Sequence, residues 1–86
     1  MAGFRIREFV VPPGGERRYI HDEWRGALVV VEKGNIEIES LGGVRLSFQA
    51  GAVLFLAGLR IRFLRNRELV PAVLTATSRR MGSRTP

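Results

Sequence analysis

The spacing of the turn signals constrains this fold more than any other feature of the sequence. Glycine, proline and asparagine interrupt the chain about every eight to twelve residues. The apolar runs between these interruptions are too short for helices, and no stretch carries a stripe of apolar residues at helical spacing. The pattern therefore predicts an all-β domain of about seven short antiparallel strands, arranged as a sandwich or a barrel.

Two neighbouring segments show the clearest alternation of apolar and polar side chains. Residues 35–40 alternate isoleucine with glutamate, and residues 44–49 alternate apolar with polar residues after a Gly-Gly turn. We expect these segments to form a hairpin with one solvent-facing side. Arg45 is expected to pair across the hairpin with Glu37 or Glu39.

Three further strands are predicted at residues 4–10, 27–31 and 72–77. The first alternates Phe4, Ile6 and Val10 with charged residues, as a half-buried strand does. The second is apolar throughout, which indicates a strand covered on both faces. The third begins after Pro71, at a position where a missing N–H is tolerated.

The stretch Gly51–Asn66 is the part around which we expect the rest to be organised. Its apolar run Val53–Leu56 is followed by Gly58 and then, from Arg60, by alternating basic and apolar residues. This order predicts a strand, a tight bend and a second strand, paired like a hairpin.

Length and composition bound the remaining possibilities. Eighty-six residues make one domain, which we place at residues 1–80, with a flexible tail at 81–86. The absence of cysteine excludes disulfides and thiolate metal sites. No apolar run approaches the roughly 20 residues of a membrane-spanning helix, so we expect a cytoplasmic protein without a membrane partner.

The charge of the chain is strongly basic and consists mainly of arginine. Fourteen basic and eight acidic residues give a formal net charge of +6, and Lys33 is the single lysine. Because the planar guanidinium group suits phosphates and carboxylates, anionic ligands and nucleic acid are candidate partners. Basic residues without interleaved aromatic residues are a weak sign of nucleic-acid binding, so we do not expect nucleic acid as the partner.

The order of residues from about Tyr19 to Arg80 resembles the cupin superfamily of small β-barrels, also called jelly rolls. Gly51 and Asn66 match the first glycine and the closing asparagine of the second cupin motif. Gly34 matches the closing glycine of the first motif, with sixteen residues between it and Gly51. The resemblance implies an antiparallel cupin-like barrel.

The sequence departs from the cupin pattern at the positions where the family binds metal. The histidine of the second motif falls on Arg62, whose guanidinium has no lone pair for a metal. The His-x-His pair of the first motif falls on His21 and Glu23, and its glutamate falls on Ala27. We therefore expect no metal and no other cofactor, and the metal-dependent activities of the family do not carry over.

The candidate ligand-binding residues are Tyr19, His21, Glu23, Trp24, Arg60 and Arg62. The resemblance implies that Arg62 points into the barrel, and a buried Arg62 needs a partner, because an unpaired buried charge costs several kcal/mol. One interpretation is an internal salt bridge with Asp22 or Glu23. The other is a pocket in which Arg62, Arg60 and His21 receive the carboxylate or phosphate of a small ligand.

These observations favour a metal-independent module that binds a small, anionic molecule or another protein, with no catalytic residue assigned. The alternative is a metal-independent isomerase or lyase that uses His21 and Glu23 as acid and base. A lesser alternative is nucleic-acid binding through the arginine-rich surface. Ile61 and Phe63 also suggest an apolar stripe opposite Arg62, covered by strand 4–10 or by a second copy. Since cupins are commonly dimers, we expect a homodimer.

Overall fold

The computed structural model describes residues 3–56 and 58–79. Within this part, eight strands and one short helix follow one another. They are β1 (Phe4–Val11), β2 (Glu16–Arg18), α1 (His21–Trp24), β3 (Ala27–Lys33), β4 (Asn35–Ser40), β5 (Arg45–Gln49), β6 (Val53–Phe55), β7 (Ile61–Arg65) and β8 (Ala72–Arg79). The all-β prediction is confirmed. The predicted tail at 81–86 lies outside the described residues.

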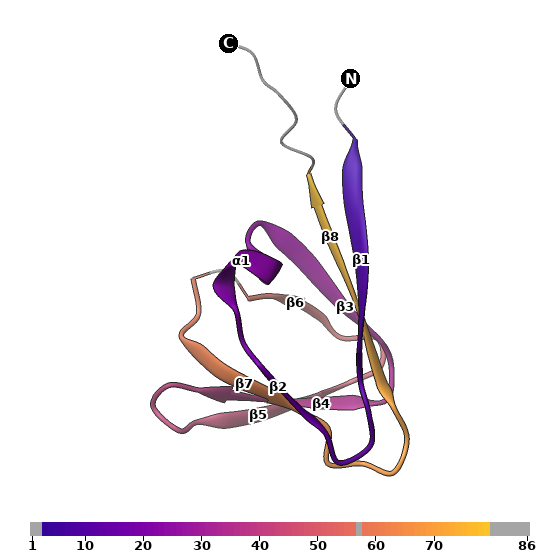
Figure 1. Cartoon of the computed structure of the whole chain (residues 1–86), viewed down its shortest axis with the longest axis vertical. Helices are drawn as coiled ribbons and strands as arrows, with labels where there is room; N and C mark the ends of the chain where they lie inside the picture. Colours follow the sequence, from indigo (N-terminus) through magenta and orange to yellow (C-terminus); the bar gives the residue numbers. More distant parts are fainter. Residues whose placement is uncertain (1–2, 57, 80–86) are drawn as a thin grey trace.

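The strands form two four-stranded antiparallel sheets. We call β1-β8-β3-β6 the first sheet and β2-β7-β4-β5 the second sheet. In Figure 1, β1 and β8 run side by side along the long axis, and the second sheet lies across the lower part of the molecule. No ladder of backbone hydrogen bonds joins the two sheets among these strands, so they are not closed into a barrel.

The pairing order shows that the chain is folded back on itself as a double ribbon. Strand β1 pairs with β8, β2 with β7, β3 with β6, and β4 with β5, each antiparallel. The ribbon therefore begins in the first sheet and changes sheet three times before it ends at the β4–β5 hairpin. Additional pairing of β3 with β8 and of β4 with β7 joins the ribbon segments into sheets.

The core lies between the facing sides of the two sheets. It is made mainly of aliphatic side chains, with Trp24 as the largest fully buried residue. The other buried members are Phe9, Val11, Ala27, Val29, Val31, Ile36, Ile38, Leu56, Ile61, Leu64, Ala72, Leu74 and Ala76. The strict alternation in 35–40 is confirmed, since Ile36 and Ile38 are buried in the core.

Three details of the predicted strands are wrong. Strands β6 and β7 lie in different sheets, so Gly51–Asn66 is a crossover and not a hairpin. Strand β3 is covered on one face only, because Leu28 is 47% exposed. Strand β1 buries Phe9 and Val11, whereas the side chains expected inside are exposed, namely those of Phe4, Ile6 and Val10. Alternation alone does not say which of the two faces meets the core.

Gly34 makes the turn from β3 in the first sheet to β4 in the second. Its φ is +76°, and a Cβ added there would lie 2.5 Å from the carbonyl oxygen of Pro71. Gly51, at the matching crossover from β5 to β6, has a φ of +97° but open space around it. Gly34 and Gly51 therefore both have a positive φ, but only Gly34 lies close to another segment of backbone.

Asn66 is the one buried polar residue among those described. Its side-chain Nδ2 donates to the carbonyl oxygens of Val11, at 3.1 Å, and Val70, at 2.7 Å. Its Oδ1 accepts a 2.9 Å hydrogen bond from the amide of Glu68. The side chain thus holds the β7–β8 connection against the end of β1.

We predict that Gly34→Ala lowers the free energy of unfolding by more than about 3 kcal/mol, because the backbone of Pro71 must move. Gly51→Ala is the matched control, and the left-handed conformation alone is expected to cost about 1–2 kcal/mol there. Urea unfolding measures both. Equal losses would contradict the close approach at Gly34.

Asn66→Asp keeps the size of the side chain but removes the donor to both carbonyls. We expect a loss of about 2–4 kcal/mol in the free energy of unfolding, since buried carbonyl groups are left without partners. Gln49→Ala, at an exposed position, serves as control and is expected to change stability by less than about 0.5 kcal/mol. A stable Asn66→Asp variant would show that these hydrogen bonds are dispensable.

Candidate functional site

The predicted site residues gather at the middle bend of the double ribbon, where β2 leads through α1 to β3 and β6 leads to β7. Four of them come from the β2–α1 segment and two from the start of β7. The backbone amide of Tyr19 donates a 2.9 Å hydrogen bond to the carbonyl oxygen of Arg62, which joins the two halves of the bend. The structure therefore brings the residues of the β2–α1 segment and those at the start of β7 to one region, but it keeps the side chains of the two groups apart.

Trp24 anchors the α1 side of this bend in the core. Its ring centroid lies 4.3 Å from that of Phe9 on β1, and the Tyr19 ring is stacked at 6.5 Å with an angle of 12° between planes. His21 is exposed and meets Tyr19 edge-on at 6.4 Å. Burial raises the pKa of the Tyr19 hydroxyl.

Two arginines outside the six predicted ligand-binding residues complete this group. The Arg17 guanidinium donates to Glu23 Oε2 at 2.8 Å, and Arg7 donates to the main-chain oxygen of Glu23. Both guanidinium groups also lie over the Phe9 ring, at 4.7 Å for Arg17 and 5.5 Å for Arg7. We call Arg7, Phe9, Arg17, Tyr19, Glu23 and Trp24 the α1 cluster.

The α1 cluster contains every buried side-chain polar atom that lacks a hydrogen-bond partner in the described chain. These atoms are Arg7 Nε, Arg17 Nε, Tyr19 Oη, Glu23 Oε1 and Trp24 Nε1. Since buried polar groups normally have partners, the concentration in one cluster is unusual. However, the atoms are inaccessible to solvent, so no ligand reaches them in this conformation.

The geometry of α1 also bears on acid–base chemistry at His21 and Glu23. These residues are two positions apart on a helix, and side chains at that spacing do not face each other. Glu23 is bound to Arg17, and Asp22 to Arg25 at 2.8 Å. The predicted salt bridge of either acid with Arg62 is therefore wrong.

Arg62 is exposed, so the prediction that it points into the interior is also wrong. Along β7, Phe63 pairs with Glu39 but Ile61 pairs with Ser40, which leaves Arg62 as an extra residue in a β-bulge. The bulge lets Ile61 and Leu64 both reach the core, although they are three residues apart. Consequently the expected apolar stripe does not form, because Ile61 is in the core.

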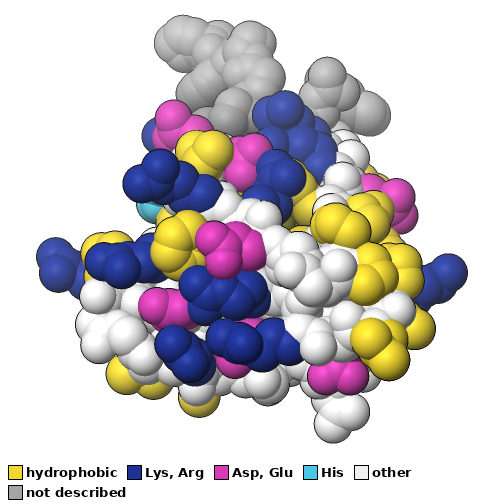
Figure 2. All heavy atoms as spheres, turned by 60° about the horizontal axis from the view of Figure 1, so that its bottom comes forward, with side chains coloured by type: hydrophobic (Ala, Val, Ile, Leu, Met, Phe, Trp, Pro, Cys, Tyr) yellow, Lys and Arg dark blue, Asp and Glu magenta, His cyan; other side chains and the backbone are white. Residues whose placement is uncertain are grey.

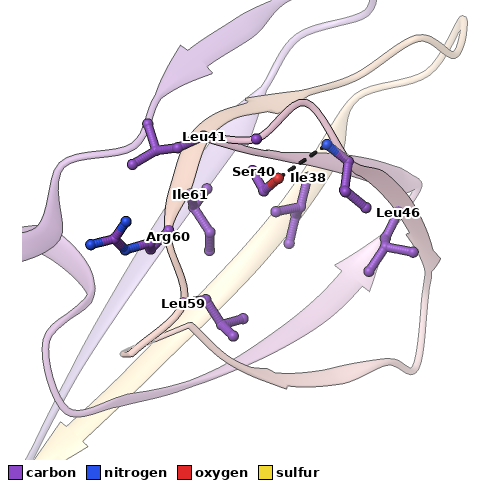
Figure 3. A pocket seen from close by; sticks show the side chains of 9 residues that line it. Ile38, Ser40, Leu41, Leu46, Leu59, Arg60 and Ile61 are labelled. Carbon is purple, nitrogen blue, oxygen red and sulfur yellow. Dashed lines mark hydrogen bonds between the residues drawn. The ribbon is translucent and has the colours of Figure 1, made fainter.

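A pocket opens beside this bulge, between the β4–β5 turn and the segment that precedes β7. Its volume is about 580 Å³. The lining residues are Ile38, Ser40, Leu41, Gly42, Val44, Leu46, Leu59, Arg60 and Ile61. Figure 3 shows Ile38, Leu46, Leu59 and Ile61 around a common space, with the Arg60 guanidinium extending outward at the rim.

Arg60 is the single charged residue of the pocket lining. Its side chain is exposed and forms no ion pair with another described residue. Its carbonyl oxygen accepts a 2.9 Å hydrogen bond from the amide of Leu41, which ties the β7 side of the pocket to the β4–β5 turn. Of the six predicted residues, Arg60 is the one that lines this cavity.

The outer face of the second sheet carries a network of ion pairs. Arg65 binds Glu16 at 2.8 Å and also Glu39, while Arg67 binds Glu37 at 2.9 Å. The predicted cross-strand pair of Arg45 with Glu39 is confirmed at 3.7 Å. Figure 2 shows basic and acidic side chains intermixed where the lower part of the molecule comes forward. This face is therefore a mixed-charge surface and not a continuous basic patch.

The residues at the cupin metal positions do not fit a metal ion. His21 is exposed, Glu23 is engaged by Arg17, and Arg62 carries no lone pair. Within residues 3–56 and 58–79, no three side chains of the His, Cys, Asp and Glu types come together as ligands. In the same part of the chain, no helix has the length and apolar character needed to cross a membrane.

No protein-family model matches the chain, and no curated protein matches its sequence.

The ion pairs of the second sheet predict a specific dependence of stability on pH. The hydrogen bond from Arg65 lowers the pKa of Glu39 below its ordinary value of 4.5, and the charges of Arg65, Arg45 and Arg62 act in the same direction. A lowered pKa in the folded state stabilises the fold above the ordinary value, and this contribution disappears as pH falls through the folded value.

We therefore expect Glu39→Gln to be less stable than the parent at pH 7, with the difference shrinking between about pH 5 and pH 3. Urea midpoints measured across this range provide the test. Glu68→Gln is the control, because Glu68 is exposed and forms no ion pair with a described residue. A Glu39→Gln deficit that persists unchanged at low pH would contradict the assignment.

Proposed function

We propose that this chain is a cupin-like jelly-roll domain that binds a small molecule without a metal. The pairing of β1 with β8, β2 with β7, β3 with β6 and β4 with β5 supports the jelly roll, since eight strands in two such sheets describe that architecture. The glycines and the asparagine that carry the resemblance lie at sheet crossovers, where the same ribbon needs them. The unsuitable residues at the metal positions support binding without an ion.

The observation that carries the proposed function is the pocket of about 580 Å³ with one positively charged side chain, that of Arg60, at its rim. Small-molecule sites commonly have volumes of about 300–1,000 Å³, with mainly apolar walls and few polar groups. The pocket meets this description, whereas the α1 cluster has polar atoms but no accessible space around them. The pocket is therefore a better candidate for the binding site than the α1 cluster.

The lining defines the class of ligand. Ile38, Leu46 and Ile61 suit an apolar body, because burying such surface contributes about 25 cal/mol per Å². Arg60 offers a long, exposed side chain that can turn toward an anionic group at the mouth. The proposed ligand is thus an apolar molecule of moderate size with one carboxylate or phosphate at its end.

Octanoate and 1-octanol are suitable probes, because they share an alkyl chain and differ in the anionic group. We expect octanoate to shift the methyl NMR signals of Ile38, Leu46 and Ile61. Arg60→Gln should weaken octanoate binding by about three- to tenfold, as for an exposed charge pair, and leave octanol unchanged. Arg62→Gln is the matched control, since Arg62 is exposed nearby but does not line the pocket.

A second variant tests the cavity itself. Leu46→Trp fills the pocket and should abolish the binding of both probes, whereas Leu69→Trp, at a residue that is 94% exposed, should not. Absence of methyl shifts with either probe at millimolar concentration would overturn the proposed function. Equal weakening by Arg60→Gln and Arg62→Gln would remove Arg60 from the site.

A further inference from the structure

The mouth of the pocket is surrounded by apolar side chains that are exposed to solvent. Leu41, Val44, Leu46 and Leu59 line the pocket, and each is between 52% and 61% exposed. They come from the β4–β5 turn, from β5 and from the connection between β6 and β7. In Figure 1, this turn and this connection lie on the same side of the molecule. A group of large exposed apolar side chains at one place indicates an interaction site.

Three arginines accompany the apolar side chains at this end of the molecule. Arg60 extends outward at the pocket rim (Figure 3), and Arg62 is exposed in the β-bulge that follows. Arg18 is exposed on β2, next to Tyr19, whose amide donates to the carbonyl oxygen of Arg62. None of the three arginines forms an ion pair with another described residue. We call the whole group the pocket-mouth surface, which consists of Arg18, Leu41, Val44, Leu46, Leu59, Arg60 and Arg62.

We propose that the pocket-mouth surface docks on an anionic lipid bilayer. The leucine and valine side chains enter the boundary between head groups and acyl chains, and the arginines bind lipid phosphates. Attachment to this boundary strengthens with the apolar area that is buried and with the attraction of basic side chains to anionic lipids. The pocket-mouth surface offers both on neighbouring elements of the fold.

A bilayer fits this surface better than a second copy or a nucleic acid does. A second copy packed here about a twofold axis would bring two sets of unpaired arginines together, and their like charges repel. A nucleic acid would match the arginines, but the apolar side chains have no aromatic ring on which bases could stack. A phospholipid carries its phosphate next to an alkyl chain, in the same order as Arg60 and the apolar walls of the pocket. In this last respect the inference rests on the proposed function.

The inferred partner differs from the sequence-based expectation of no membrane partner. That expectation concerned segments long enough to span a bilayer, whereas docking needs only side chains that enter its outer part. These side chains become neighbours only in the folded chain. The amide of Leu41 donates a 2.9 Å hydrogen bond to the carbonyl oxygen of Arg60, and this contact brings the β4–β5 turn beside Leu59.

Sedimentation of the full chain with lipid vesicles tests the basic part of the surface. Phosphatidylcholine vesicles that contain about 30% phosphatidylglycerol should bind the chain at least tenfold more tightly than phosphatidylcholine alone. Arg60→Gln and Arg62→Gln should each weaken binding to the anionic vesicles about fivefold, as expected for one basic residue near the membrane. Arg79→Gln is the control, since Arg79 is exposed on β8 in the other sheet, and should change binding less than about twofold.

The apolar part is tested at Leu41. We expect Leu41→Glu to weaken vesicle binding at least tenfold, whereas Leu28→Glu, at a residue of the first sheet that is 47% exposed, should bind like the parent. Bromine-labelled acyl chains should quench the emission of a Leu41→Trp variant. They should not quench the added fluorophore of Leu69→Trp, because the β7–β8 connection lies on the other side of the molecule (Figure 1).

Octanoate binding separates the failure of this inference from the failure of the proposed function. Arg62→Gln should weaken vesicle binding without changing octanoate binding, because Arg62 does not line the pocket. Octanoate shifts without vesicle binding overturn the bilayer and leave the proposed function standing, whereas vesicle binding without octanoate shifts does the reverse. Equal binding to both vesicle compositions overturns the inference. Equal losses for Leu41→Glu and Leu28→Glu, or for Arg62→Gln and Arg79→Gln, overturn it as well.

Discussion

The arrangement of the two sheets depends on how the double ribbon is held where it passes from one sheet to the other. At one bend, the Asn66 side chain binds the carbonyl oxygens of Val11 and Val70, and its backbone amide donates to Gly15. At another bend, the amide of Ala50 donates to Gly34, and that of Gly51 donates to Val31. A crossover must satisfy its backbone polar groups without a neighbouring strand, and these hydrogen bonds do so.

The middle bend, where β2 leads through α1 to β3 and β6 leads to β7, is less regular than the other two crossovers. It holds the buried polar atoms of the α1 cluster without partners, and the β-bulge at Arg62 lies on its other side. Bulges and unsatisfied polar groups reduce stability, and they tend to occur at functional positions in proteins. The pocket beside Arg60 lies next to this bend. The crossovers on either side of the middle bend are thus closed by hydrogen bonds, whereas the middle bend is less regular.

The two outer faces show how one sandwich separates its surfaces by chemistry. The second sheet places glutamate opposite arginine on neighbouring strands, as in Glu37 and Glu39 with Arg65. The first sheet places mainly threonine, aliphatic residues and phenylalanine at the corresponding outward positions, with Glu8, Lys33 and Arg79 as the charged exceptions. Exposed ion pairs contribute little stability but keep a face soluble, whereas an apolar face stabilises the protein only when it is covered. The two outer faces thus differ in chemistry.

Local patterns in the sequence determined the strand class, most strand positions and the β4–β5 hairpin with its Arg45–Glu39 pair, because alternation and turn residues act over a few neighbouring positions. They also led to the β2–α1 segment and to Arg60. Only the tertiary structure decided that β6 and β7 belong to different sheets, that β1 buries Phe9 and exposes Ile6, and that a bulge turns Arg62 outward. Each of these depends on the partner strand, since a strand offers two faces and the packing of distant residues selects the one that is buried. Arg7 and Arg17 escaped notice for the same reason, because their position over Phe9 arises from contacts between β1, β2 and α1.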